Sequence, residues 1–356
     1  MKIRSKRSAR SSRYRSTPAR SPARFAFEDT WLACIMANLK NKSILVTGGA
    51  GFIGSHLVDA LIEEKPSKIV VVDNFFLGKM ENLFEAKKNF PKLKIIVQDA
   101  TNFEAMKRII NRESIDVVFN LATKALEHSF VDPDDAYMVN VNLASVLLRL
   151  LHQKKYRTLI HCSSSEAYGT AQKIPINENH PLCPHTLYAA GKAAADLMVR
   201  SYYHTYKLDV AIARPFNTYG PRQNEGIYAA VIPITLRKIT SDEPPIIYGD
   251  GNQTRDFIYV EDTTRGIIDT YKNEKTRGRE INIAFGKEIK IKDLIHIIAK
   301  EMDYKGKILR RPARIADVRR HLAGTKLAKE LIGFKPKYSF AEGMRKTIDW
   351  YKKYLR

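Results

Sequence analysis

Short apolar runs alternate with longer segments of helical character along much of the chain. Most runs hold three or four apolar residues in succession, which is typical of a parallel strand buried on both faces. Repeated strand–helix units of this length imply a parallel sheet with helices on both faces. The pattern therefore predicts a doubly wound α/β fold. The predicted strands are 44–46, 69–72, 94–97, 117–119, 158–161 and 210–213, and the predicted helices are 53–64, 102–112, 134–152 and 187–206.

The alternation becomes irregular from about residue 218, where prolines are frequent. Pro221, Pro233, Pro244 and Pro245 fall in this part of the chain, and proline interrupts both helices and central strands. We expect a smaller C-terminal lobe here, interleaved with a few elements that return to the core. The predicted units are a basic extension over 1–41, a core over 42–217 and the lobe over 218–356.

Basic residues gather at the start of the chain. Residues 1–35 hold nine Lys or Arg against Glu28 and Asp29, with almost no apolar pattern before Trp31. A segment of this composition cannot bury enough apolar surface to fold, so we predict that it is disordered. Three origins fit it: an organelle transit peptide, a basic tail for an acidic partner, or an extension upstream of a true start at Met36. We favour the start at Met36, because a strand follows it within a few residues.

The net charge of +22 does not by itself indicate a nucleic-acid partner. Beyond the extension the positive charge is spread without a long basic run or a nucleic-acid motif, so we expect no nucleic acid to bind. Such a surface suits anionic pyrophosphate compounds at least as well. No segment approaches the ~20 apolar residues of a membrane helix, so no membrane partner is expected. Cys34, Cys162 and Cys183 lack metal-ligand spacing, which predicts reduced thiols, no metal site and a cytoplasmic protein.

A glycine-rich turn, TGGAGFIG from Thr47, joins the first predicted strand to the first predicted helix. Its glycine spacing permits a tight turn, close approach of the backbone to a pyrophosphate, and close packing of helix on strand. The N-terminus of the helix also attracts phosphate groups. This is the Rossmann pattern of dinucleotide binding, and the alternative is a purely structural glycine turn. The candidate cofactor residues in it are Gly48, Gly51, Phe52, Ile53 and Gly54.

Carboxylates at two strand ends refine the expected dinucleotide. Asp73 ends the second predicted strand, where a carboxylate can accept hydrogen bonds from the adenosine ribose and would repel a 2′-phosphate. We therefore predict NAD rather than NADP. Asp99 ends the third strand, where it could meet the adenine amino group or simply cap a loop. Their neighbours Asn74 and Ala100 are further candidate cofactor residues.

A tyrosine and a lysine four residues apart lie on one face of a predicted helix. Tyr188 and Lys192 begin and end the run YAAGK, and a nearby ammonium favours the phenolate and so lowers the pKa of a phenol. Such a tyrosine can act as a general base. Ser164 follows the fifth predicted strand, whose carboxyl end faces the ligand crevice of a doubly wound sheet. A serine there could hydrogen-bond the hydroxyl that Tyr188 deprotonates, although a serine-rich turn alone would also explain it.

With these motifs the chain resembles the extended short-chain dehydrogenase/reductases of the NAD-dependent epimerase/dehydratase family. The resemblance covers about residues 42–350. In combination the motifs are specific for the family and much less specific for the reaction. They are TGGAGFIG from Thr47, NLA from Asn120, SSEAYG from Ser164, YAAGK from Tyr188, RPFNTYGP from Arg214 and RDFIYVED from Arg255.

The resemblance implies roles for individual positions. Tyr188 would be the catalytic base, Lys192 its partner and Ser164 the third member, with Tyr188 and Lys192 also contacting the cofactor. The C-terminal lobe would bind a nucleotide-diphosphate sugar, whose phosphates arginine can match bidentately. Further cofactor-binding roles are implied for Leu121, Ala122, Thr123 and Pro215, and substrate-binding roles for Lys124, Ser165, Asn217, Arg222, Arg255 and Arg319.

The family shares a first step, oxidation of the sugar at C4, and its members differ in the later steps. Glu166 resembles the base with which the dehydratases remove the C5 proton, and UDP-glucuronate decarboxylases share the same run of residues. The dTDP-glucose 4,6-dehydratases have an acidic Asp where this chain has Ser165, and serine is a poor acid. Lys124 is similar to a lysine of the 4-epimerases. We predict a nucleotide-sugar 4,6-dehydratase, with UDP-hexose 4-epimerase and UDP-glucuronate decarboxylase as alternatives.

The resemblance also bears on assembly and on catalytic competence. Helices 134–152 and 187–206 are richer in apolar and small residues than one sheet face requires. Family members pair these two helices into a four-helix bundle, which implies a homodimer. Other members serve as redox-sensing or RNA-binding scaffolds and tend to lose the catalytic Tyr or Lys. Because this chain keeps both, we expect an enzyme rather than a scaffold.

Overall fold

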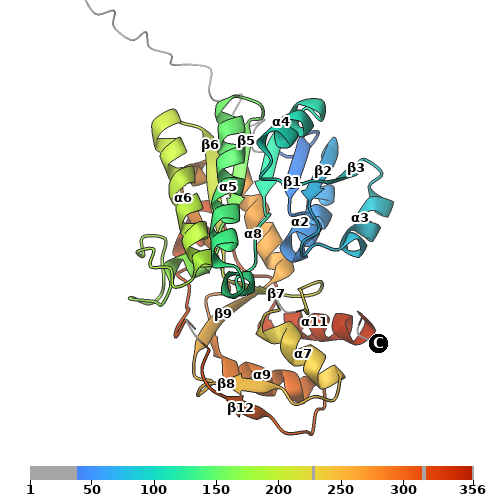
Figure 1. Cartoon of the computed structure of the whole chain (residues 1–356), viewed down its shortest axis with the longest axis vertical. Coiled ribbons are helices and arrows are strands. Elements are labelled where there is room, and N and C mark those ends of the chain that lie inside the picture. Colours follow the sequence, from blue (N-terminus) through green and yellow to red (C-terminus); the bar gives the residue numbers. More distant parts are fainter. Residues whose placement is uncertain (1–37, 227–228, 315–317, 355–356) are drawn as a thin grey trace, which may run out of the picture.

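The computed structural model describes residues 38–354, apart from 227–228 and 315–317 (Figure 1). The described residues form an upper body built on a parallel sheet and a smaller lobe below it. The basic extension over residues 1–35, with Cys34 and the expected start at Met36, lies outside the described residues.

The upper body contains, among the described residues, a seven-stranded sheet in the order β10-β6-β5-β4-β1-β2-β3. All neighbouring strands in it are parallel. The chain winds outward from β1 first to β3 and then to β6, which is the doubly wound arrangement that the sequence predicted. The strands are β1 Ser43–Thr47, β2 Lys68–Asp73, β3 Leu93–Val97, β4 Val117–Asn120, β5 Thr158–Cys162, β6 Asp209–Pro215 and β10 Glu280–Ile283.

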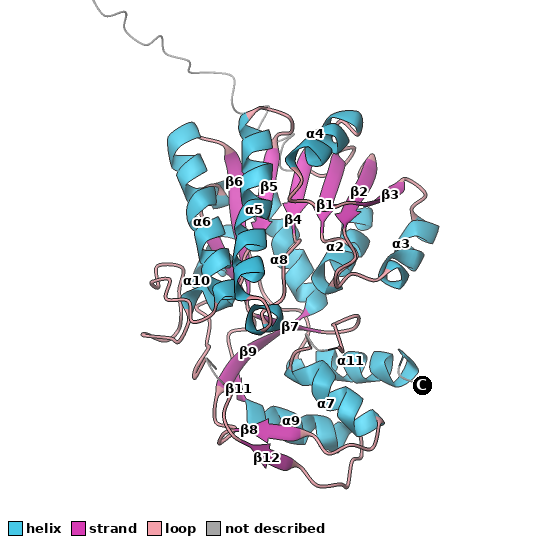
Figure 2. Ribbon diagram, viewed as in Figure 1, coloured by secondary structure: helices cyan, strands magenta, loops and turns pink. Residues whose placement is uncertain are grey.

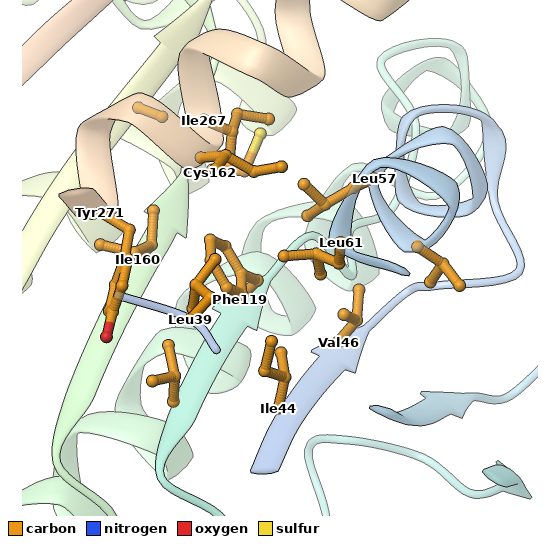
Figure 3. Packing of buried hydrophobic residues seen from close by; sticks show 14 of the residues in the cluster. Leu39, Ile44, Val46, Leu57, Leu61, Phe119, Ile160, Cys162, Ile267 and Tyr271 are labelled. Carbon is orange, nitrogen blue, oxygen red and sulfur yellow. The ribbon is translucent and has the colours of Figure 1, made fainter. Parts of the chain in front are cut away.

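Helices cover both faces of this sheet because side chains alternate along each strand. Ile44 and Val46 of β1 pack in one cluster with α2 and α8 (Figure 3), whereas Leu45 between them packs in another cluster with α5. Burial of such a side chain stabilises the fold by about 1.5–3 kcal/mol. One face carries α2 Phe52–Glu63 and α8 Val260–Lys272, and the other carries α4 Phe103–Arg112, α5 Pro133–His152 and α6 Leu187–Tyr206.

A side-chain cap fixes the start of the helix that carries the predicted catalytic pair. Thr186 accepts a hydrogen bond from the backbone N–H of Ala189 at 3.2 Å, as a threonine before a first helical turn commonly does. Because α6 begins at Leu187, Tyr188 lies in its first turn and Lys192 one turn later. The helix predicted over 187–206 is confirmed at both ends.

The lower lobe is built from short elements that the sequence pattern did not resolve (Figure 2). Its strands pair in the orders β11-β9-β7 and β12-β8. Elements α8, β10 and α10 follow residue 217 in the chain and pack on the upper body, so the expected interleaving is confirmed, while a division at residue 217 stays a prediction. The elements not yet given are η1 Met80–Leu83, α3 Phe84–Asn89, η2 Glu127–Phe130, η3 Ser165–Tyr168, β7 Asn217–Tyr219, α7 Val231–Thr240, β8 Ile246–Tyr248, β9 Thr254–Tyr259, η4 Glu274–Thr276, β11 Glu288–Lys290, α9 Ile291–Glu301, β12 Leu309–Arg311, α10 Lys326–Ile332 and α11 Phe340–Tyr354.

None of the described helices combines the length and the apolar character needed to cross a membrane.

Candidate active site

A cavity of about 370 Å³ opens at the carboxyl ends of strands β1, β2, β4, β5 and β6. This is where a doubly wound sheet places its ligands. Every residue predicted to bind the cofactor lines it, although these residues come from six separate stretches of sequence. They are Gly48, Gly51, Phe52, Ile53, Gly54, Asp73, Asn74, Asp99, Ala100, Leu121, Ala122, Thr123, Tyr188, Lys192 and Pro215.

A second cavity of about 940 Å³ adjoins the first on the side of the lower lobe. The two share part of their walls, including Glu127, Glu166, Asn217 and Thr218. Many of the other residues that line the second cavity come from α7, β8, β9 and the segment after β12. The site therefore consists of one chamber on the sheet side and one on the lobe side, which meet at these shared residues.

The glycine turn has the shape that a bound pyrophosphate requires. Gly48 has φ +67°, and a Cβ atom there would lie 2.6 Å from the backbone N of Ala122. A Cβ at Gly54 would lie 2.1 Å from the carbonyl oxygen of Gly48, so the turn could not close with any other residue. Helix α2 begins after Gly51 without a side-chain cap, which leaves the N–H groups of its first turn to meet an anion.

Asp73 holds the loop around this turn and presents its carboxylate to the cavity. Its oxygens accept hydrogen bonds from the backbone N–H groups of Ala50 at 2.9 Å and Phe75 at 2.8 Å. Burial raises the pKa of Asp73, and the two backbone hydrogen bonds oppose that shift. A carboxylate has about four lone-pair positions, so two remain for ribose hydroxyl donors. The residues present fit an NAD molecule.

The predicted catalytic residues converge on the wall of the first cavity. Lys192 is buried and its Nζ donates a hydrogen bond to the Cys162 carbonyl oxygen at 3.1 Å. Tyr188 is hydrogen-bonded to Ser164, which also accepts a hydrogen bond from the backbone N–H of Glu166 at 3.2 Å. The structure thus brings together residues from the end of β5, from η3 and from α6.

One electrostatic expectation is wrong in this structure. We expected Lys192 to lower the pKa of Tyr188, whereas the pKa of Tyr188 is raised, chiefly by burial. The hydrogen bond with Ser164 opposes this rise, and the charge of Glu166 adds to it. The lysine ammonium is directed at the Cys162 carbonyl instead, and burial lowers the pKa of Lys192. The phenolate therefore needs a further positive charge beside it.

Glu127 is a residue of this site that the sequence analysis missed. It begins the short helix η2 and lines both cavities, as Glu166 does. Burial, the largest cause, raises the pKa of Glu127 to about 7; Arg314 opposes this shift and Glu166 adds to it. In the sequence, Glu127 could have been noticed from its position four residues beyond the predicted cofactor residue Thr123. A carboxylate in an irregular segment is usually solvated, so this signal was weak.

The three predicted phosphate-binding arginines lie in different places. Arg222 lines the first cavity and its guanidinium bonds to the Asp59 carboxylate at 2.7 Å. Arg255 lines the second cavity. Arg319 lines neither cavity, and its guanidinium donates two hydrogen bonds of 2.9 Å to Asp250 on the surface. The structure therefore brings Arg222 and Arg255 to the site and leaves Arg319 outside it.

Further polar residues complete the two chambers. Arg314, which the sequence analysis did not single out, lines the second cavity with its guanidinium 4.3 Å from the centre of the Tyr248 ring. Lys124 lines the first cavity, where its ammonium forms an ion pair with Asp135 at 2.9 Å and lies 3.7 Å from the centre of the Phe76 ring. Predicted substrate residues Ser165 and Asn217 also line the first cavity.

The combination of a glycine cradle for a dinucleotide with a Ser–Tyr–Lys group defines the class as NAD-dependent enzymes of the short-chain dehydrogenase/reductase type. Residues 45–347 match the family model described as "GDP-mannose 4,6 dehydratase". The chain belongs to this family, whose members are NAD-dependent nucleotide-sugar dehydratases, epimerases and decarboxylases. The predicted family membership is confirmed.

Individual relatives support the family and divide on the reaction. The chain is 33% identical to "Putative UDP-glucose 4-epimerase" of Methanocaldococcus jannaschii, over 87% of this chain and 98% of that protein. It is 32% identical to "dTDP-D-glucose 4,6-dehydratase" of Homo sapiens, over 87% and 90% respectively. The crystal structure of dTDP-glucose 4,6-dehydratase from Streptomyces venezuelae with NAD bound superposes with a TM-score of 0.82 and 28% identity, covering 87% of this chain and 97% of that one. The predicted cofactor, NAD, is confirmed.

Proposed function

We propose that the protein is a nucleotide-sugar 4,6-dehydratase that acts through a transient 4-keto sugar. The observation that carries the proposal is the position of Glu166. Glu166 lines the cavity that Tyr188 and Ser164 also line, and it is one of the residues shared with the lobe-side cavity. A site that only oxidised and reduced C4 would need one base, whereas removal of a C5 proton needs a second one.

The first step is the oxidation of the sugar at C4, in which Tyr188 is the base. Its phenolate accepts the proton of the C4 hydroxyl while Ser164 holds that hydroxyl in place by a hydrogen bond. When bound, NAD supplies the hydride acceptor and a positive charge that favours the phenolate. Lys192, anchored to the Cys162 carbonyl, contributes a second positive charge to the same wall of the cavity.

The second step is the removal of the C5 proton, in which Glu166 is the base. A ketone at C4 acidifies the hydrogen at C5, and the Glu166 carboxylate removes it. Water then leaves from C6, and the hydride that was removed from C4 in the first step is returned to C6. The proton that Glu166 accepted returns to C5, which gives a 4-keto-6-deoxy sugar.

The lobe-side cavity supports the assignment of the substrate as a nucleotide-diphosphate sugar. Its walls include the cationic side chains of Arg237, Lys238, Arg255 and Arg314. Two phosphates carry negative charge into a partly desolvated cleft, and such charge requires cations and hydrogen-bond donors. The sugar would then lie at the junction of the cavities, beside Glu166.

A 4-epimerase is the second candidate function. The relative from Methanocaldococcus jannaschii named above carries an epimerase name, and Lys124 lines the first cavity. An epimerase would turn the 4-keto sugar over and return the hydride to its other face, leaving Glu166 without a proton to remove. A UDP-glucuronate decarboxylase is a third candidate, because the decarboxylases share the run of residues that contains Glu166.

Incubation with UDP-glucose, dTDP-glucose, GDP-mannose, UDP-N-acetylglucosamine and UDP-glucuronate in deuterated water tests the proposal. We expect one of the neutral hexose compounds to lose the mass of one water and to gain deuterium at C5. Inversion without a change in composition would establish the epimerase, and loss of CO₂ from UDP-glucuronate would establish the decarboxylase.

A substitution isolates the second base. We expect Glu166→Gln to lower the rate of water loss by about 100-fold or more, because the amide cannot accept the C5 proton. Glu104→Gln is the matched control, since Glu104 is exposed on α4 and its substitution should leave the rate unchanged. Equal rates of water loss in wild-type protein and Glu166→Gln would contradict the role of Glu166.

We further propose that the protein is a homodimer that pairs α5 and α6 with the same helices of a second copy. Both helices expose a large apolar side chain, Met138 at 51% and Leu197 at 52%, which a monomer would leave in water. We expect Leu197→Glu to convert a dimer into a monomer when mass is measured by light scattering. Ile297→Glu on α9 is the control and should not alter the mass, and a monomeric wild-type protein would refute the proposal.

A further inference from the structure

Two carboxyl groups, from Glu127 and Glu166, lie in the walls that the two cavities share. They come from different 3-10 helices, η2 after β4 and η3 after β5. Each acts electrostatically on the other, and both act on Tyr188. The dehydratase mechanism proposed above uses Glu166 and Tyr188 and gives no task to Glu127.

The same mechanism lacks a proton donor for the C6 hydroxyl. Hydroxide is a poor leaving group, so the oxygen must be protonated as the C6–O bond breaks. Ser165 lines the site, but its hydroxyl is a weak acid. Glu166 must be a carboxylate to accept the C5 proton, so it cannot be the donor in the same step.

We propose that Glu127 is the general acid that protonates the departing C6 hydroxyl, an inference that rests on the proposed dehydratase function. Glu127 lines both cavities, as does Glu166, the base that it complements. The two residues would then have complementary roles, with Glu166 ionised as the base and Glu127 protonated as the acid.

The charges around Glu127 support this division. Burial is the largest cause and raises the pKa of Glu127. A backbone hydrogen bond and the charge of Arg314 lower it, the charge of Glu166 raises it, and the resulting pKa is about 7. At neutral pH roughly half of the Glu127 carboxyls then carry a proton. The negative charge of Glu166 adds to the effect of burial because a second carboxylate beside Glu127 makes its ionisation less favourable.

The protons of the cycle balance. Glu166 takes the C5 proton, the electron pair of that C–H bond forms the C5–C6 double bond, and the C6–O bond breaks as the oxygen takes the proton of Glu127 and leaves as water. The hydride that was removed from C4 in the oxidation then adds to C6, and Glu166 returns its proton to C5. Tyr188 has gained the proton of the C4 hydroxyl and Glu127 has lost one, so the transfer of one proton from Tyr188 to Glu127 through solvent restores the enzyme.

Glu127→Gln tests the inference on whichever of the hexose compounds named above the wild-type protein dehydrates. We expect water loss from the substrate to slow by about 100-fold or more. Glu104→Gln is again the matched control. We also expect wild-type activity to fall as pH rises through about 7, because Glu127 then loses its proton. Glu127→Asp should retain this fall, because it keeps a carboxyl group.

A second substrate separates an acid from a merely structural residue. The 6-deoxy-6-fluoro analogue loses fluoride, which is a much weaker base than hydroxide and needs little protonation. We expect Glu127→Gln to process this analogue at a rate within a few-fold of wild type. A structural defect would slow both substrates equally, and that result would overturn the proposal.

The two proposals fail in different ways. If wild-type protein removes water from none of the five nucleotide sugars, the dehydratase function is wrong and the role of Glu127 falls with it. If wild-type protein removes water and Glu127→Gln removes it equally fast, only the role of Glu127 is wrong. Should Glu127→Gln fail to fold, slower water loss in Glu127→Asp with the fall in activity above about pH 7 retained supports the role, and water loss as fast as in wild type refutes it.

Discussion

Replacement of Tyr188 by Phe is expected to abolish nearly all turnover while leaving the fold intact. The ring stays in place, but the atom that accepts the C4 hydroxyl proton is lost, along with its hydrogen bond to Ser164. General acid–base groups typically contribute 10²–10⁴-fold, so we expect a decrease of about 1,000-fold in kcat. The measurement is the rate of product formation from the nucleotide sugar that wild-type protein converts.

The control is the same chemical change elsewhere on the same helix. Tyr206 is half exposed at the far end of α6, so Tyr206→Phe should leave kcat unchanged. Calorimetric binding of NAD to Tyr188→Phe should stay within a few-fold of wild type, because the glycine turn is untouched. Full turnover in Tyr188→Phe would refute the catalytic assignment and revive the alternative of a binding scaffold.

Replacement of Arg214 by Met is expected to cause a large loss of stability. The Arg214 guanidinium lies 2.6 Å from the Asp196 carboxylate, and both side chains are almost completely buried. Ser163 also donates a hydrogen bond to Asp196 at 2.6 Å. Removal of one partner leaves a buried carboxylate without its counter-charge, which costs about 3–5 kcal/mol. Chemical denaturation at constant pH measures this free energy of unfolding.

This ion pair also affects the catalytic helix. Asp196 lies on α6 one turn beyond Lys192 and two turns beyond Tyr188, so residues at this spacing share one face of the helix. The pair therefore ties α6 to β6, where Arg214 is located. We expect Arg214→Met to lower turnover as well as stability, although Arg214 touches no substrate.

A double substitution checks whether the cost comes from the unpaired charge. Asp196→Asn combined with Arg214→Met removes both charges and keeps an acceptor for Ser163, so it should recover most of the stability. Lys272→Met breaks a half-exposed pair with Glu64 and should cost less than about 1 kcal/mol. If Arg214→Met is no less stable than Lys272→Met, the buried pair does not have the assigned effect.

Sequence patterns predicted the upper body and its cofactor site because both depend on local geometry. A buried parallel strand is an apolar run wherever it occurs, and the turn after β1 tolerates only glycine where a Cβ would meet backbone atoms. The carboxyl ends of parallel strands lie along one edge of the sheet, so residues such as Asp73 and Leu121 could be assigned to one cavity before any contact was known. The spacing of Tyr188 and Lys192 on one helix face required no more than helical periodicity.

The lobe-side cavity could not be predicted in the same way. Its walls come from short strands and irregular segments, which carry little periodic signal. Among the arginines, Arg319 lies outside the site and Arg314 lines it, although the sequence pattern favoured Arg319. Charge alone does not say which of several neighbouring arginines faces inward, because the answer depends on how distant segments fold over one another.

The sequence alone therefore determined the fold class, the NAD cradle and the members of the Ser–Tyr–Lys group, since each follows from spacing within a few residues or from the order of strands in a sheet. Only the tertiary structure decided that Glu127 and Glu166 line the same two cavities and that burial raises the pKa of Glu127. Glu127 and Glu166 lie 39 positions apart in the chain, and the burial that raises the pKa of Glu127 arises when two strand ends and the lower lobe close around one cavity. The physical reason is that burial and charge pairing are properties of the packed molecule rather than of any one segment.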